Sequence, residues 1–286
     1  MLNKRLTILI TTFNEKDRLD LIIKRYSEYA EIILLDNHSE DGTIELARNY
    51  GIKVVKRRKK GGLEIGDIIS GVEIAGGEWI HLCGCSEVLT DGLLKKIRLL
   101  IDANKYDAIA IGRKSYTWGF NTHYVKYGYQ QVGCNIEDNF RFINKHKIDW
   151  NKSRIHFETP GTIEKNRVKF LTEDDENIIH HFREGNPYLI NEKHALYSDM
   201  EAKSIFKNNN VKNKNILIKI FFSPLKRFLL DFYQFPTVGG FISAICNAQL
   251  VLNIQMTLYI LNKFGYEYNI ENEKLRKRFE SLCQNE

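Results

Sequence analysis

A regular alternation of strand-like and helix-like segments, over about the first hundred residues, is the feature that most constrains the fold. Short runs of branched apolar residues predict strands at 5–12, 31–36, 53–56 and 79–83. Apolar residues at helical spacing predict helices at 15–30, 39–49, 64–75 and 91–104. Because strands that alternate with helices pair in parallel, the sequence predicts an α/β fold with a mostly parallel sheet and helices on both faces.

Beyond this alternation the character of the chain changes twice. Residues 111–210 consist of shorter pieces that are rich in aromatic side chains. Residues 211–286 open with basic side chains and continue as long apolar segments. We therefore predict three parts, 1–110, 111–210 and 211–286, and we expect the last part to be helical.

The last part contains a long stretch without a charged residue, from Phe232 to Asn262. Its length would span a bilayer, but amide side chains lie in its middle, at Asn247, Gln249, Asn253 and Gln255. The segment before it has one apolar face with Lys226 and Arg227 alongside. These features favour a helix on a membrane surface over a helix buried in the fold or one that spans the bilayer.

The cysteines and the charge narrow the class of protein. The 5 cysteines are an odd number at scattered positions, which argues against a disulfide framework and for a reducing compartment. The apolar run near the N-terminus is too short for a signal peptide, so we expect a cytoplasmic protein. A net charge of +6 permits an acidic partner without demanding one, and we expect no nucleic-acid binding.

Two polar segments follow the first two predicted strands, TTFNE at 11–15 and DNHSEDGT at 36–43. Ligands of such sheets bind beyond the carboxyl ends of the strands, which is where these segments lie. TTFNE, the pattern D-x-x-S-x-D-G-T and the segment AGGEWIHL at 75–82 together resemble the inverting family 2 glycosyltransferases, which have the Rossmann-like GT-A fold. The resemblance covers roughly residues 1–110, which would form the nucleotide-sugar-binding half, with 111–210 as the acceptor-binding half.

The resemblance implies a nucleotide-sugar donor, with a UDP-sugar favoured. Phe13 would provide a wall for the base, Glu15 would accept from the imide N–H, and Asp36 would accept from the ribose hydroxyls. The alternatives are a solvated acid at a helix start for Glu15 and a turn-forming aspartate for Asp36. Ser39 and Asp41 would cap the following helix, with or without a donor contact. The predicted donor-binding set is Thr11, Phe13, Glu15, Asp36, Ser39, Ser86 and Glu87.

The strand that carries the metal-binding acids in the resembled family ends differently here. The two acids align with Gly84 and Ser86, and only Glu87 remains of the acidic motif. Glycine has no side chain, and a neutral hydroxyl is a weak ligand for a hard cation. We therefore assign no metal ligand, and dependence on Mg²⁺ or Mn²⁺ is poorly supported.

Three interpretations of this replacement are open. In the first, fixed cations stabilise the leaving diphosphate in place of an ion, with Arg113, His181 and Arg183 as the candidates. In the second, the chain keeps the fold but has lost the transfer reaction. In the third, His81, Cys83 and Cys85 hold a soft metal such as zinc, because alternate residues of a strand share one face. The alternative for the two cysteines is that they are small buried residues.

An inverting transferase also needs a general base that takes the proton of the acceptor hydroxyl. The segment RIHFETP, at 154–160, resembles the lipopolysaccharide-core glucosyltransferase branch of the family, with Phe157 inserted between His156 and Glu158. Glu158 is therefore the first candidate for the base, and Glu137 and Asp138 are its rivals. The same resemblance implies a glycan or glycolipid acceptor at the inner face of the cell membrane.

Two functions of different classes remain. The first is a glycosyltransferase, a hexosyltransferase of family 2 type, which modifies a lipopolysaccharide core, a capsule or a lipid-linked oligosaccharide. The second is an inactive pseudo-glycosyltransferase that docks on a membrane as a scaffold. A nucleotidyltransferase is disfavoured, because TTFNEKDR lacks the glycines of a phosphate loop.

Overall fold

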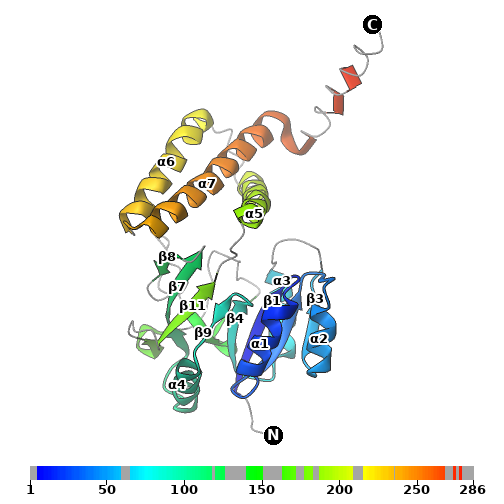
Figure 1. The fold of residues 1–286 in the computed structure, drawn as a ribbon, viewed down its shortest axis with the longest axis vertical. Coiled ribbons are helices and arrows are strands. Elements are labelled where there is room, and N and C mark those ends of the chain that lie inside the picture. The colour runs from blue at the N-terminus through cyan, green and yellow to red at the C-terminus, as the bar shows by residue number, and fades with distance from the viewer. Residues whose placement is uncertain are drawn as a thin grey trace. The chain divides into compact units, whose positions relative to one another are not determined.

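The computed structural model describes residues 5–58, 65–117, 120–125, 140–150, 163–171, 177–182, 187–208, 215–234, 236–267, 273–274 and 277–278. The chain divides into two compact units, Met1–Gly185 and Asn186–Glu286. Strands and flanking helices make up the first unit, and long helices make up the second (Figure 1). The predicted division at residues 110 and 210 concerns function, and it stays a prediction.

The first unit is built on a seven-stranded sheet with the strand order β10-β6-β9-β4-β1-β2-β3. Its strands are β1 (Leu6–Thr12), β2 (Glu31–Asp36), β3 (Lys53–Lys56), β4 (Trp79–Gly84), β6 (Ala108–Ala110), β9 (Phe140–Asn144) and β10 (Val168–Phe170). Neighbouring strands are parallel except at β9, which is antiparallel to both β4 and β6. The predicted mostly parallel α/β sheet of GT-A type is confirmed.

A second, smaller sheet has the order β5-β11-β7-β8. Its strands are β5 (Glu87–Val88), β7 (Gly112–Thr117), β8 (Phe120–Val125) and β11 (Ile178–Phe182). β5 begins three residues after β4 ends, so the short turn at Cys85-Ser86 joins the two sheets. The chain therefore passes from one sheet to the other at the segment that was predicted to correspond to the metal motif.

Helices cover both faces of the large sheet, because alternate residues of its strands point to opposite sides. The helices are α1 (Lys16–Tyr26), α2 (Thr43–Asn49), α3 (Ile65–Ile74) and α4 (Asp91–Asp102). Ile8 and Ile10 of β1 belong to the core cluster that includes residues of α1 and α4. Leu9 between them belongs to the cluster that includes residues of α3. The prediction of helices on both faces is confirmed.

The predicted boundaries hold better for strands than for helices. β2 and β3 have the predicted bounds of 31–36 and 53–56. The second helix starts at Thr43 rather than at residue 39, because His38 (φ 62°) and Gly42 (φ 93°) have left-handed backbone conformations that no helix continues through. Residues 37–42 are therefore a loop at the carboxyl edge of the sheet.

The second unit contains α5 (Pro187–Asn208), α6 (Ile216–Gln234) and α7 (Val238–Phe264), followed by a short 3₁₀ turn at Gly265–Glu267. The first unit has two such turns among its described residues, at Lys145–Lys147 and Lys165–Arg167. A small core joins α5 and α7 through Ala202, Ile254, Leu258 and Leu261. α7 is long and apolar enough to cross a membrane, and only 22% of its most apolar window is buried. The three alternatives for this segment, a helix on a membrane surface, a helix buried in the fold and a helix that spans the bilayer, all stay predictions.

Candidate active site

The two motif loops at the carboxyl ends of β1 and β2 are tied to each other by reciprocal hydrogen bonds. The backbone N–H of Asn14 donates to Ser39 Oγ at 2.9 Å, and the side-chain oxygen of Asn14 accepts from the backbone N–H of Glu40 at 2.9 Å. The backbone N–H of Glu15 donates to Thr43 Oγ1 at 3.0 Å. TTFNE and DNHSEDGT therefore form one double loop, which explains why their polar residues occur in a fixed order.

Asp36 is the buried anchor of this double loop. Its side chain is 0% exposed, one carboxylate oxygen accepts from Thr12 Oγ1 at 3.1 Å, and the other accepts from the backbone N–H of Ser39 at 3.0 Å. This arrangement matches the turn-forming alternative for Asp36. A contact with the ribose stays a prediction, and it would require the loop to open around the carboxylate.

Asp41 accepts a backbone hydrogen bond at the start of the second helix, in line with the capping prediction, whereas the Ser39 hydroxyl bonds to Asn14. The hydroxyl of Ser39 is committed to Asn14, and the N-cap position of α2 is Gly42, which has no side chain. Asp41 accepts from the backbone N–H of Thr43, at the start of α2, and from that of Lys16, at the start of α1. A single carboxylate thus holds the first turns of two helices in place.

A buried ion pair supports the loop from the other side. Nε of Arg57 lies 3.1 Å from Oδ2 of Asp67 in α3, and both side chains are almost fully buried. The backbone N–H of Arg57 donates to the carbonyl of Asp36 at 2.9 Å, and its carbonyl contacts His38 Nε2 at 3.0 Å. The ion pair therefore fixes the backbone that flanks the motif loop. Sequence reasoning missed it, since the basic run around Arg57 is typical of a solvated surface.

Thr11, Gly84 and Ser86 meet where β1 and β4 end. The hydroxyl of Thr11 donates to the carbonyl of Cys83 at 3.3 Å. A Cβ atom placed on Gly84 would lie 3.6 Å from Ser86 Oγ and 3.7 Å from Thr11 Oγ1, which are ordinary contacts. Phe13 is exposed on the adjoining loop. The sheet edge thus offers small hydroxyl groups and an exposed aromatic ring at the position predicted for a donor.

Glu87 lies beside this edge, and two arginines share its carboxylate. Nη1 of Arg113 lies 2.8 Å from Oε1 of Glu87, and Nη1 of Arg141 lies 3.9 Å from the same oxygen. Burial alone would raise the pKa of the Glu87 carboxyl, but the charges of Arg141, Arg113 and His181 outweigh it and lower the pKa to about 2. Two guanidinium groups and one carboxylate leave this cluster with a net positive charge.

The neighbouring elements hold the cluster in position. His181 of β11 pairs with Glu87 across the small sheet, and Arg113 extends from the next strand, β7. The hydroxyl of Tyr26 in α1 donates to the carbonyl of Glu87 at 3.1 Å and accepts from the backbone N–H of Leu89 at 2.9 Å. α1, β7 and β11 therefore fix β5 directly after the turn that replaces the metal motif.

Arg141 is the residue of this cluster that sequence reasoning did not assign to the diphosphate. It belongs to β9, the antiparallel strand between β4 and β6, and its carbonyl accepts from Nδ1 of His81 at 2.6 Å. A charged residue between two phenylalanines in a strand-like run was the available signal. Of the other predicted residues, Glu137, Asp138, Glu158 and Arg183 lie outside the described residues.

The soft-metal alternative for His81, Cys83 and Cys85 is wrong. His81 is buried and stacks on Phe142 at a ring distance of 4.3 Å, and burial lowers its pKa to about 4. Cys83 and Cys85 belong to the apolar core, and burial raises the pKa of both thiols, which disfavours the thiolates that zinc requires. Both cysteines are small buried residues, which is the alternative that was given for them.

The residues at the altered motif do not fit a hard divalent cation either. Across the described residues, no group of three His, Cys, Asp or Glu side chains could hold a metal ion. Gly84 has no ligand atom, Ser86 offers only a neutral hydroxyl, and the carboxylate of Glu87 is engaged by two arginines. The positive charge next to this edge of the sheet comes from protein side chains.

Several solved structures resemble the chain at low sequence identity. A mannosyltransferase of Pyrobaculum calidifontis, in complex with GDP-Man and Mn²⁺, is 12% identical, with a TM-score of 0.48 over 92% of this chain and 88% of that chain. TarS of S. aureus, in complex with UDP-GlcNAc, is 13% identical, with a TM-score of 0.47 over 99% of this chain and 92% of that chain. No curated protein sequence matches significantly.

The sequence profile described as Glycosyl transferase family 2 matches residues 7–163, which is more than half of the chain. The matched segment includes both motif loops, the altered end of β4 and the arginines of β7 and β9. The chain belongs to glycosyltransferase family 2.

Proposed function

We propose that this protein transfers a sugar from a nucleotide-diphosphate donor, preferably a UDP-sugar, to a glycan of the cell envelope, with inversion at the anomeric carbon. The observation that carries the proposal is the double loop of TTFNE and DNHSEDGT, locked at the carboxyl edge of the parallel sheet of a family 2 chain. This edge is where open α/β sheets bind their ligands. Its exposed Phe13 and its hydroxyl groups supply contacts that suit a nucleotide.

Transfer is a single displacement. The acceptor hydroxyl oxygen attacks the anomeric carbon while the bond from that carbon to the donor phosphate breaks, and the nucleoside diphosphate leaves with the bonding electron pair. A carboxylate base takes the hydroxyl proton, with Glu158 as the first candidate and Glu137 or Asp138 as the others. Inversion follows because the attack and the departure take place on opposite faces of the sugar.

The departing diphosphate carries developing negative charge that needs a fixed positive counterpart. Arg113 and Arg141 lie behind the Cys85-Ser86 turn and are held in place by Glu87 and the surrounding strands. A cluster that is already buried and oriented needs little reorganisation when charge develops. In this proposal the two guanidinium groups, with His181 and Arg183, stabilise the leaving diphosphate. A metal ion held by carboxylates would have this role elsewhere in the family.

The acceptor is proposed to be a lipopolysaccharide core, a capsular glycan or a lipid-linked oligosaccharide. The support is the resemblance of RIHFETP and of the segment that leads into α5 to the lipopolysaccharide-core branch. Such an acceptor places the protein in the cytoplasm, peripheral on the inner face of the cell membrane. Apolar helices in the second unit are compatible with that location.

The test is a panel of nucleotide sugars assayed for transfer and for donor hydrolysis, with and without EDTA. We expect turnover of one donor, most readily a UDP-sugar, and calorimetric binding of its nucleoside diphosphate. The proposal would be overturned if no donor were transferred or hydrolysed and no nucleotide bound.

A second candidate function is a membrane-docked pseudo-glycosyltransferase that organises a glycan assembly complex. It is favoured by the loss of both acids at Gly84 and Ser86 and by the engagement of Glu87 with arginines. It predicts that Glu158→Ala has no effect in cells, whereas removal of residues 211–286 abolishes function. A strong phenotype from Glu158→Ala in a stable protein would count against it.

A further inference from the structure

α6 leaves many apolar side chains exposed, whereas a charged pair faces α7 together with Phe228 and Phe232, which contact Phe241. Nε of Arg227 lies 2.8 Å from Oδ2 of Asp231, and the same oxygen accepts from Asn247 of α7 at 2.8 Å, so the charged pair lies on the side that packs against α7. The exposed residues of α6 include Leu217, Ile218, Phe221, Phe222, Leu225, Leu229, Leu230 and Tyr233. A helix at a protein surface in water does the reverse and buries its apolar stripe.

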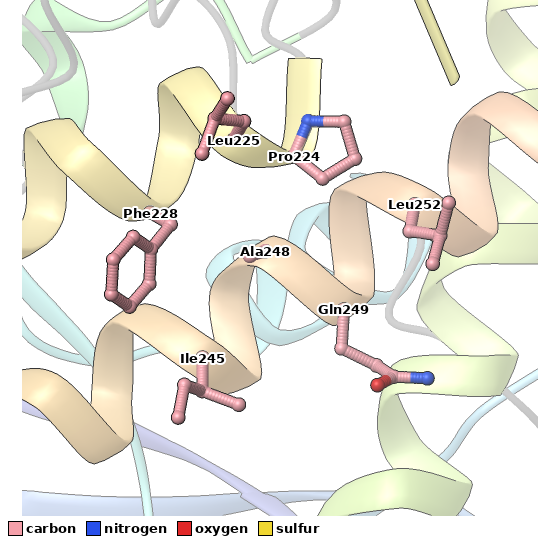
Figure 2. Close-up of a pocket in the computed structure, with 7 residues that line it drawn as sticks. All are labelled: Pro224, Leu225, Phe228, Ile245, Ala248, Gln249 and Leu252. Atoms are coloured by element: carbon pink, nitrogen blue, oxygen red, sulfur yellow. The ribbon is translucent and has the colours of Figure 1, made fainter. Parts of the chain in front are cut away.

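α7 extends this apolar surface. Val238, Phe241, Ile245 and Met256 are exposed along α7. Between the helices lies a groove of about 280 Å³, lined by α6 from Pro224 to Phe228 and by α7 from Ile245 to Leu252. Figure 2 shows the lining side chains on two adjacent helices, and Gln249 is the polar one among them. We call the exposed apolar side chains of both helices, with this groove, the hairpin face.

The charges around the hairpin face have one dominant sign. The charged residues of α6 and α7 are Lys219, Lys226, Arg227, Asp231 and Lys263. Asp231 is their one acid, and Arg227 and Asn247 already engage it. Lys219 and Lys226 are seven residues apart, which is close to two helical turns, so both project from the same edge of the apolar stripe.

We propose that the hairpin face inserts into one leaflet of an anionic phospholipid bilayer, parallel to its surface. The apolar stripe would enter the acyl region, the groove would take part of an acyl chain, and Lys219 and Lys226 would reach the lipid phosphates. A partner of this chemistry accounts for the exposed apolar side chains and for the lysines at once. The inference concerns the second unit alone, so it stands or falls separately from the transferase activity.

Two other occupants fit less well. A helix pair that spans the bilayer would place the Arg227–Asp231 pair and the lysines of α6 within the hydrocarbon, where charges are costly. A second copy of the chain would bring a second set of lysines to the same contact, with no unengaged acid in α6 or α7 to balance them. An anionic leaflet meets the lysines with the opposite charge.

The experiment is sedimentation of the full chain with two kinds of vesicle, one of phosphatidylcholine alone and one of equal parts phosphatidylcholine and phosphatidylglycerol. We expect binding to both, and tighter binding to the anionic vesicles. The double variant L225E/L229E is expected to lose about a hundredfold in partition coefficient, because two leucines no longer enter the apolar region. The matched control is L21E/L99E, two leucines of α1 and α4 that are 69% and 71% exposed, and it should bind like the wild type.

The lysines have a separate variant. K219Q/K226Q should weaken binding to anionic vesicles by about fivefold for each lysine and leave binding to neutral vesicles unchanged. K95Q/K105Q, which removes two exposed lysines of the first unit, is the matched control and should change neither. Circular dichroism and thermal unfolding of every variant verify that the helices remain folded.

Two results would overturn the inference. The first is equal sedimentation of L225E/L229E and the wild type with anionic vesicles. The second is that the wild type does not bind vesicles and instead forms a dimer in solution, while L225E/L229E is monomeric. The hairpin face would then bind a second copy of the chain. Nucleotide binding by the first unit is measured in parallel, so a failure of membrane docking is distinguishable from a failure of the transferase proposal.

Discussion

Nη1 of Arg113 lies 2.8 Å from Oε1 of Glu87, the one acid predicted to remain of the metal motif, and Arg141 approaches the same oxygen. The carboxylate of Glu87 holds two fixed cations in place. This relationship makes the positive charge at the carboxyl end of β4 a property of the protein. It also means that removing an arginine should affect catalysis more than removing divalent ions.

We predict that Arg113→Gln lowers kcat for sugar transfer by about 10²–10³-fold, because one oriented donor to the developing charge is lost. Arg141 would still neutralise Glu87, so the fold should persist. The measurement is steady-state transfer, with thermal unfolding to verify the fold. Arg98→Gln, which removes an exposed arginine of α4, is the control and should retain the wild-type rate.

Restoring the two acids should restore an ion site. In the double variant G84D/S86D, two carboxylates would join the end of β4, where a Cβ at Gly84 has only ordinary contacts. We expect Mn²⁺ binding by calorimetry, since paired carboxylates are hard oxygen ligands. G92D/K95D adds the same number of carboxylates to the exposed surface of α4 and should bind no ion. Unchanged ion affinity in G84D/S86D would show that these positions do not correspond to the family's acids.

Breaking the buried pair of Arg57 and Asp67 should destabilise the first unit. Asp67→Ala leaves a buried guanidinium without its carboxylate, and such a loss costs about 3–5 kcal/mol. Nucleotide affinity should fall as well, because Arg57 supports the backbone beside Asp36. Chemical denaturation measures the first effect and calorimetry the second. Asp102→Ala, at an exposed pair, should change stability by less than about 1 kcal/mol.

Acid should destabilise the protein in two windows. His81 has its pKa lowered from 6.5 to about 4 by burial, so between these values the unfolded chain binds a proton that the folded chain does not. Stability should therefore fall by up to about 1.4 kcal/mol per pH unit as the pH drops from 6.5 towards 4. His81→Phe can still stack on Phe142, and it should reduce the slope of the unfolding free energy against pH between 6.5 and 4.

The second window belongs to Glu87. Its pKa is lowered from 4.5 to about 2 against the effect of burial, so its stabilising contribution is fully present above 4.5 and is lost as the pH falls towards 2. Glu87→Gln should remove this acid dependence, in addition to any loss of stability at neutral pH. Urea unfolding at a series of pH values measures both windows. A Glu87→Gln profile parallel to that of the wild type would contradict the assignment.

The sequence predicted the parallel sheet because its first four strands, β1 to β4, are local apolar runs, and β2 and β3 have the predicted ends. It also placed TTFNE and DNHSEDGT at the binding edge, because each segment directly follows one of these strands. It did not predict the Arg141–Glu87 contact, because β9 joins the sheet in antiparallel orientation between β4 and β6, and no local pattern specifies that pairing. The helix start at Thr43 was missed because His38, which is not a glycine, adopts a left-handed conformation.

The exposure of α6 also lay beyond the reach of the sequence. The sequence predicted one apolar face for this helix, but the periodicity did not indicate which part of it packs against α7. The position of Arg227 and Asp231 against α7 decided which side is covered, through a hydrogen bond to Asn247. Tertiary contacts of polar groups, rather than hydrophobic periodicity, set the orientation of this helix.

The most direct measurement of the central claim is the rate of sugar transfer by the wild type and by Arg113→Gln, each with EDTA and with added Mn²⁺. Fixed arginines in place of a metal ion predict that EDTA leaves the wild-type rate unchanged and that Arg113→Gln is slow under both conditions. The claim is contradicted if EDTA abolishes transfer and Mn²⁺ restores it, or if Arg113→Gln keeps the wild-type rate.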